Sequence, residues 1–109
     1  MRIISGTLKG KKLYEPKDFL TRPLKDLTKE SIFNIITHSN KFKIALHNAD
    51  ILDLFSGTGS FGLECLSRAS KHVVFVENYK NILPILKKNI NNLNFEENSE
   101  VIEKDIDNS

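Results

Sequence analysis

The sequence predicts an α/β fold in which helices alternate with the strands of a parallel sheet. Residues 50–55 and 72–76 are short and almost continuously apolar, which is typical of strands buried on both faces of such a sheet. Each run is followed by apolar residues at helical spacing, in residues 60–69 and 79–93, and residues 100–103 form a third short run. Elements in this order are joined by right-handed crossovers, which makes the strands parallel.

The second of these helices carries two features near its start. Asn78 precedes it and can cap its first turn. Pro84 lies inside the helical pattern, and we expect it to kink the helix or to shorten it at its N-terminal end.

The chain divides into a basic N-terminal extension, residues 1–45, and an acidic sheet domain, residues 46–109. The extension has ten Lys and Arg against four Asp and Glu, whereas the sheet domain has six against ten. A basic arm on an acidic body favours a polyanionic partner held beside a separate small-molecule site. A solvated, lysine-rich surface is the alternative.

Two elements are predicted in the extension. Residues 2–7 and 11–14 are extended runs with Gly10 between them, which predicts a β-hairpin. Residues 25–37 carry apolar residues at helical spacing, which predicts a helix.

Composition excludes several classes of protein. With 39% hydrophobic and 28% charged residues, the chain resembles an ordinary globular domain. It has neither the ~18 uninterrupted apolar residues of a membrane span nor the apolar core of a signal peptide, so we expect a cytoplasmic location. Cys65 is the only cysteine and lies in an apolar run, which favours a small buried side chain and no metal site.

A glycine-rich turn is the strongest motif. Residues 57–62, Gly-Thr-Gly-Ser-Phe-Gly, match the G-x-G-x-x-G pattern between a predicted strand and a predicted helix. Glycines let the chain turn sharply and approach a ligand closely, and the N–H groups at the start of the helix act as donors. The alternative is a tight turn that binds nothing.

Three acids lie at the carboxyl ends of the predicted strands and indicate which nucleotide binds. Asp53 precedes the glycines, where it would repel a diphosphate but suit a ligand with an amino group and a sulfonium, such as S-adenosylmethionine. Glu77 is placed to accept hydrogen bonds from ribose hydroxyls, and Asp105 to contact an adenine amino group. Each acid could instead be a surface charge, and Asp53 could cap the turn. An NAD-dependent oxidoreductase is a further alternative, against which Asp53 argues.

Residues 53–64 closely resemble the first motif of the bacterial enzymes that methylate N2 of a guanine in small-subunit ribosomal RNA. Residues 2–13 look like the opening hairpin of that family, and residues 21–36 are similar to its N-terminal signature, which packs near the cofactor. The resemblance implies a hairpin and helix followed by the first half of a Rossmann-like methyltransferase sheet.

The resemblance also implies site residues. The residues expected to bind S-adenosylmethionine are Asp53, Phe55, Ser56, Gly57, Thr58, Gly59, Glu77, Asn78, Asp105 and Arg22. Those expected to contact phosphates of small-subunit rRNA, or of its assembling ribonucleoprotein, are Arg2, Lys9, Lys11, Lys12 and Arg22. Neither DNA nor a membrane is an expected partner. The role of Arg22 stays open between cofactor and RNA.

Members of this family also carry an Asn/Asp-Pro-Pro-aromatic loop after a fourth strand, and this sequence has no such loop. No catalytic residue is therefore named. We expect the chain to be truncated and inactive alone, with residues 50–55 left as an exposed apolar edge. A complementing chain would supply the missing half. The alternative is a non-catalytic module that binds the cofactor or RNA with a partner chain.

Overall fold

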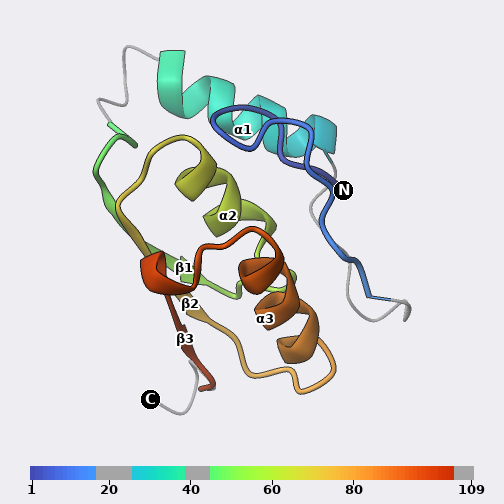
Figure 1. The fold of residues 1–109 in the computed structure, drawn as a ribbon. Coiled ribbons are helices and arrows are strands. Elements are labelled where there is room, and N and C mark those ends of the chain that lie inside the picture. Colours follow the sequence, from blue (N-terminus) through green and yellow to red (C-terminus); the bar gives the residue numbers. More distant parts are fainter. Residues whose placement is uncertain (17–25, 39–44, 105–109) are drawn as a thin grey trace.

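A computed structural model describes residues 1–16, 26–38 and 45–104 (Figure 1). The elements in chain order are α1 (Asp26–His38), β1 (Asp50–Leu54), α2 (Ser60–Ser67), β2 (His72–Val76), α3 (Leu83–Asn92), the short 3-10 helix η1 (Glu96–Asn98) and β3 (Ser99–Ile102). The alternation of strand and helix from β1 to β3 confirms the predicted α/β fold.

The three strands form one parallel sheet in the order β1-β2-β3. Asp53 lies opposite Phe75, and Phe75 opposite Val101, so the carboxyl ends of the strands meet at one edge of the sheet. Within the described residues β1 is an edge strand, paired only with β2.

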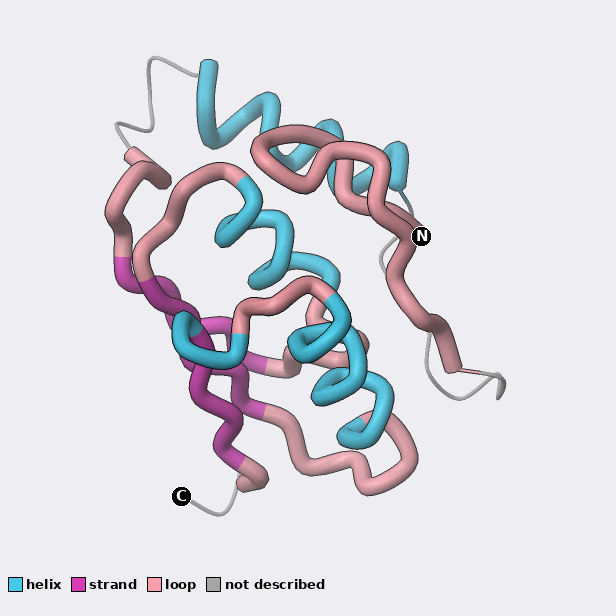
Figure 2. The backbone as a smooth tube through the Cα atoms, in the orientation of Figure 1, coloured by secondary structure: helices cyan, strands magenta, loops and turns pink. Residues whose placement is uncertain are grey.

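The molecule is layered, with the sheet on one side, α2 and α3 next to it, and α1 outermost beside the N-terminal segment (Figures 1 and 2). Gly62 of α2 lies directly against β2, because a Cβ there would come within 2.4 Å of the Phe75 ring and 2.9 Å of Val73. On the outer side of α2, Phe61 stacks on Phe33 of α1 with ring centroids 5.0 Å apart.

The two faces of the sheet differ in what covers them. Val73 and Phe75 are fully buried beneath α2. Successive residues of a strand point to opposite faces, so Leu52 and Leu54 flank Asp53 on the other side. There they remain 62% and 47% exposed. Leu52 and Leu54 therefore leave an apolar face of β1 open to solvent among the described residues. The predicted open edge is a separate feature, seen in the position of β1 at the end of the described sheet.

The predicted N-terminal hairpin is not seen as a pair of strands. Residues 1–16 contain one isolated antiparallel bridge, between Arg2 and Lys12. The backbone N–H groups of Ile4 and Ser5 donate instead to the Glu64 carboxylate. Residues 1–3 and 10–13 are joined by three backbone hydrogen bonds, whereas the N–H groups of residues 4, 5, 7 and 8 donate to α2. The two arms therefore pair only in part and form no regular ladder.

The start of α3 differs from the prediction as well. The helix begins at Leu83, four residues later than expected, with Pro84 in its first turn. Proline is tolerated there because the N–H groups of a first turn have no intrahelical partner. Its N-cap is Ile82, so Asn78 does not cap it, and the expectation that Pro84 shortens the helix is confirmed. The other helices begin and end within two residues of their predicted limits.

Candidate cofactor site

The turn between β1 and α2 has an unusual backbone. Gly57 and Gly59 have φ angles of 57° and 89°, a region that favours glycine. Phe55 also has a positive φ of 58° and leaves 75% of its surface exposed. For an aromatic residue this conformation is strained, and strain of this kind concentrates at functional sites.

The space above the turn is open at one glycine and closed at the other. A Cβ on Gly57 would meet nothing within 4 Å, whereas one on Gly59 would come within 2.7 Å of Leu86 in α3. Gly59 therefore packs the turn against the protein, while Gly57 leaves room for a ligand to approach the backbone.

Asp53 lies beneath this turn with only 8% of its surface exposed. Its Oδ2 accepts a hydrogen bond from Gly62 N–H at 3.2 Å. Burial raises the pKa of Asp53 to about 6, against the lowering effect of the bonds with Gly62 and Ser56, and nearby Glu77 adds to the rise. A cation bound beside Asp53 would stabilise its ionised form, so the site suits a positively charged ligand.

Glu77 follows β2 and ties the turn to the next strand. Its Oε1 accepts Gly57 N–H at 2.7 Å, and its Oε2 accepts the N–H groups of Asn78 and Tyr79 at 3.1 and 3.0 Å. Each carboxylate oxygen can accept two hydrogen bonds, so Oε1 retains an acceptor position. The sequence predicted that Glu77 accepts hydrogen bonds from ribose hydroxyls, but it did not predict the bond from Gly57 N–H that holds the glycine turn.

The remaining predicted cofactor residues differ in their surroundings. Ser56 is buried and its hydroxyl donates to the Asp53 carbonyl at 2.6 Å. Thr58 is buried and its hydroxyl donates to Met1 Sδ at 3.5 Å. Asn78 is exposed beside Glu77. Arg22 and Asp105 lie outside the described residues.

Four of the residues expected to contact RNA lie in the described N-terminal segment, which contacts α2. Arg2, Lys9, Lys11 and Lys12 are all exposed. The segment is anchored by its backbone, because Thr7 N–H donates to the Ser67 carbonyl at 2.8 Å and Leu8 N–H to the Ser67 hydroxyl at 3.0 Å. The basic side chains thus lie on a segment whose backbone is attached to the C-terminal end of α2.

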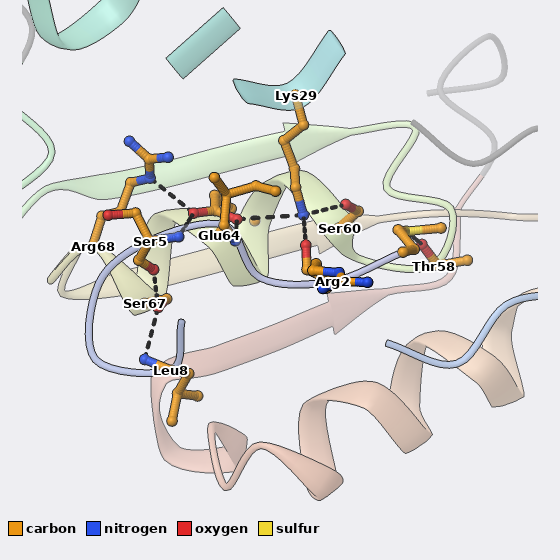
Figure 3. Close-up of polar contacts among 12 residues, drawn as sticks. Arg2, Ser5, Leu8, Lys29, Thr58, Ser60, Glu64, Ser67 and Arg68 are labelled. Atoms are coloured by element: carbon orange, nitrogen blue, oxygen red, sulfur yellow. Dashed lines mark hydrogen bonds and ion pairs between the residues drawn. The ribbon is translucent and has the colours of Figure 1, made fainter. Parts of the chain in front are cut away.

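A buried ion pair that sequence reasoning missed connects α1 with α2 (Figure 3). Lys29 and Glu64 are both fully buried, with Nζ 3.3 Å from Oε1. Lys29 also donates to the Arg2 carbonyl at 2.6 Å and the Ser60 hydroxyl at 3.0 Å, and Arg68 Nε donates to Glu64 Oε2 at 2.8 Å. The signal in the sequence was Glu64 itself, an acid within the apolar run of a predicted helix.

A surface hollow of about 220 Å³ lies elsewhere, between α3 and β3. Its lining residues are Lys87, Ile90, Asn91, Glu96, Ser99 and Val101. None of these is a predicted site residue. The hollow does not include Asp53, Glu77 or the glycine turn, which lie at the carboxyl ends of β1 and β2.

Cys65 is fully buried, as predicted, and burial raises its pKa to about 12, which leaves the thiol unreactive. The described ranges contain no cluster of three or more potential metal ligands. Nor do they include any helix with the length and apolar character needed to cross a membrane.

A parallel sheet, a glycine turn leading into a helix, and acids at the carboxyl ends of two neighbouring strands define the first half of a Rossmann-like methyltransferase fold. The Escherichia coli protein yhhF, named as a candidate methyltransferase, superposes with a TM-score of 0.77 at 30% identity, over 96% of this chain and 52% of that one. A hypothetical protein of Thermus thermophilus superposes with a TM-score of 0.77 at 23% identity, over 98% and 57% of the two chains, which supports the fold.

Sequence comparison identifies the family. The model of the family described as conserved hypothetical protein 95 matches residues 1–109. Ribosomal RNA small subunit methyltransferase D of Haemophilus influenzae is 39% identical over 93 residues, which cover 85% of this chain and 45% of the relative. YlbH of Bacillus subtilis, named as a candidate rRNA methyltransferase, is 36% identical over 105 residues, which cover 96% and 54%. The chain belongs to this family of S-adenosylmethionine-dependent methyltransferases and spans about half the length of the curated relatives it matches.

Proposed function

We propose that this chain is the cofactor-binding half of an enzyme that transfers a methyl group from S-adenosylmethionine to N2 of a guanine in small-subunit rRNA. The observation that carries the proposal is the pair Asp53 and Glu77, which lie at the carboxyl ends of neighbouring strands and flank a glycine turn with open space above Gly57. The names of the relatives, ribosomal RNA small subunit methyltransferase D among them, supply the RNA substrate.

The two carboxylates fit the chemistry of the cofactor. The ligand carries a cationic amino group and a sulfonium, which the under-paired carboxylate of Asp53 would attract. A ribose diol donates hydrogen bonds, and Oε1 of Glu77 can accept one. When bound, the cofactor supplies the methyl group, and this chain's residues hold and orient it.

The basic N-terminal segment would supply affinity for RNA. Lys9, Lys11 and Lys12 are exposed on a segment whose backbone is attached to Ser67, at the end of α2 away from the glycine turn. The same segment reaches the turn at Tyr14, because the Asn89 amide bonds both Tyr14 and the Thr58 carbonyl. Phosphate contacts from such residues add affinity with little sequence selectivity. The RNA would thereby be held next to the methyl donor.

Calorimetric titration with S-adenosylmethionine and S-adenosylhomocysteine tests the cofactor site. We expect saturable binding that Asp53→Asn abolishes and that weakens below pH about 6, where Asp53 becomes protonated. Asp50→Asn, on an exposed residue of the same strand, is the matched control and should bind normally. Absence of binding by folded chain would overturn the cofactor role. A response to NAD instead would favour an oxidoreductase.

The transfer step needs groups that orient the guanine amine, and residues 1–109 contain no Asn/Asp-Pro-Pro-aromatic motif for this role. The lone pair of a guanine N2 amine is delocalised into the ring, so the amine must be oriented by acceptors and the base stacked on an aromatic ring. We propose that the open edge of β1 receives the elements that relatives carry in the half of their length beyond this match. Leu52 and Leu54, exposed on β1, would then be covered.

A complementation experiment tests this assembly. The second half of the Haemophilus influenzae relative, produced separately, is mixed with this chain, and complex formation and methyl transfer to small ribosomal subunits are measured. We expect both, and we expect Leu54→Lys to weaken the complex. Leu27→Lys, at a 76% exposed position on α1, is the control. Cofactor binding without any complex formation would favour the alternative of a non-catalytic binding module.

A further inference from the structure

Asn89 is a polar residue in the middle of the buried face of α3. The other buried residues of this helix are Leu83, Leu86 and Ile90, and Asn89 leaves only 1% of its surface exposed. A buried amide lowers stability unless its hydrogen bonds are made. Its place among leucine and isoleucine therefore calls for specific partners.

The amide of Asn89 makes three hydrogen bonds, all to backbone groups. Oδ1 accepts Tyr14 N–H at 2.7 Å, and Nδ2 donates to the carbonyls of Tyr14 at 3.1 Å and Thr58 at 2.9 Å. Both donor hydrogens of the amide are used. One side chain thus joins α3, the N-terminal segment and the glycine turn.

The bond to Thr58 falls at the peptide that determines the shape of the turn. The carbonyl of the Thr58–Gly59 peptide points to Asn89, and its N–H donates to the Ser56 carbonyl at 2.9 Å. Held at both ends, this peptide cannot rotate freely, although the φ angle of Gly59 on one side of it has the wide range of a glycine. Leu86, one helical turn before Asn89, packs close to Gly59 and limits how far the turn can move.

The bonds to Tyr14 attach the N-terminal segment to the same point. Tyr14 is further held by Lys88, whose Nζ lies 4.0 Å from the centre of the tyrosine ring. The segment that carries Lys11 and Lys12 is therefore connected to the glycine turn through one residue of α3. No sequence pattern singled out Asn89, because its chemistry depends on backbone groups distant in the chain.

We propose that Asn89 is a positioning residue, which orients the Thr58–Gly59 peptide for the cofactor and links that orientation to the docking of the basic N-terminal segment. The proposal rests on the cofactor role of the turn. It assigns Asn89 no contact with the cofactor and no part in the chemical step.

The test compares two variants of neighbouring buried residues. Asn89→Leu replaces the amide with an apolar side chain of similar size and so removes the three hydrogen bonds. Ile90→Ala weakens the packing of the same helix and leaves the bonds to the turn in place. Affinity for S-adenosylhomocysteine is measured by calorimetry under conditions where urea titration shows both variants to be folded. We expect Asn89→Leu to lose about tenfold or more in affinity and Ile90→Ala to lose little. Equal losses in the two variants, or none in Asn89→Leu, would overturn the proposal.

A second measurement separates this proposal from the cofactor role itself. Amide hydrogen exchange at Gly59 and Tyr14 is recorded without ligand, with Asn92→Leu, on an exposed position of α3, as a further control. Exchange at both amides that is faster in Asn89→Leu than in the unmodified chain, and unchanged in Asn92→Leu, would support the positioning role. This result would hold even if the unmodified chain bound no cofactor. Unchanged exchange at both amides would contradict it.

Discussion

The two sides of α2 each hold a buried carboxylate, and they satisfy it to different extents. On the α1 side, Glu64 receives the N–H groups of Ile4 and Ser5, the Nε of Arg68 and the charge of Lys29. On the sheet side, the Asp53 carboxylate receives Gly62 N–H at 3.2 Å. Its pKa is raised to about 6, chiefly by burial.

The difference separates a structural carboxylate from one suited to binding. A buried charge is tolerated when opposite charges and donors surround it, and Glu64 meets that condition within the described residues. Asp53 meets it only partly, so a bound cation would stabilise it further. Incomplete pairing at Asp53 costs stability in the free protein and leaves interaction energy available for a ligand.

The largest expected effect comes from breaking the structural pair. Glu64→Gln removes the charge opposite Lys29, and loss of one partner of a buried pair typically lowers the free energy of unfolding by about 3–5 kcal/mol. Urea unfolding measures the change. Glu100→Gln, at an exposed position on β3, should change stability by less than about 0.5 kcal/mol. A similar small effect for Glu64→Gln would show that the network does not hold α1 and the N-terminal segment in place.

Asp53→Asn should raise the free energy of unfolding, whereas Glu64→Gln lowers it. The amide can still accept Gly62 N–H, but it removes a charge whose pKa is raised from 3.8 to about 6 in the folded state. Above pH 6 the folded chain must ionise a buried acid that the unfolded chain ionises easily, which lowers stability by up to about 3 kcal/mol. The variant should therefore be more stable than the unmodified chain above pH 6.

The pH dependence checks the sign of this effect. Between pH 3.8 and about 6 the folded state holds a proton on Asp53 that the unfolded state has released, so this group's contribution to stability falls as pH rises. The stabilisation by Asp53→Asn should disappear near pH 4 in urea unfolding measured at several pH values. A variant less stable than the unmodified chain at pH 7.5 would mean that Asp53 is as well paired as Glu64.

The smallest expected effect concerns the turn above Asp53. The Cβ that Gly57→Ala adds meets no atom within 4 Å. The effect of this substitution on stability therefore comes only from the left-handed φ of 57°. We expect a loss of about 1 kcal/mol in the free energy of unfolding, together with weaker cofactor binding because the Cβ occupies the open space. Gly62→Ala, whose Cβ would clash with Phe75, should cost more stability. Equal losses in the free energy of unfolding for the two variants would show that a Cβ at Gly57 is as poorly accommodated as one at Gly62, and that the space above the turn is not open.

The parallel order of the strands and the position of the glycine turn were predictable because they depend on local patterns. Apolar runs of strand length, glycines followed by a helical pattern, and acids at strand ends all occur within short stretches of sequence. The bounds of β2 were predicted as the structure has them, and those of β1 and β3 to within one residue. The N-terminal hairpin does not form two regular strands, because Glu64 and Ser67, about sixty residues away, bind the backbone of residues 4–8. Only residues 1–3 and 10–13 pair across it.

By itself, the sequence of this protein determined the α/β alternation, the turn after β1 and the placing of Asp53 and Glu77 beside it, since these follow from hydrophobic periodicity and glycine chemistry. Only the tertiary structure decided that Glu64 and Lys29 form a buried pair, that Glu77 holds Gly57, and that Asn89 joins Tyr14 to Thr58. Those roles depend on which backbone groups are brought near a side chain by packing. That proximity has no local signature in the chain.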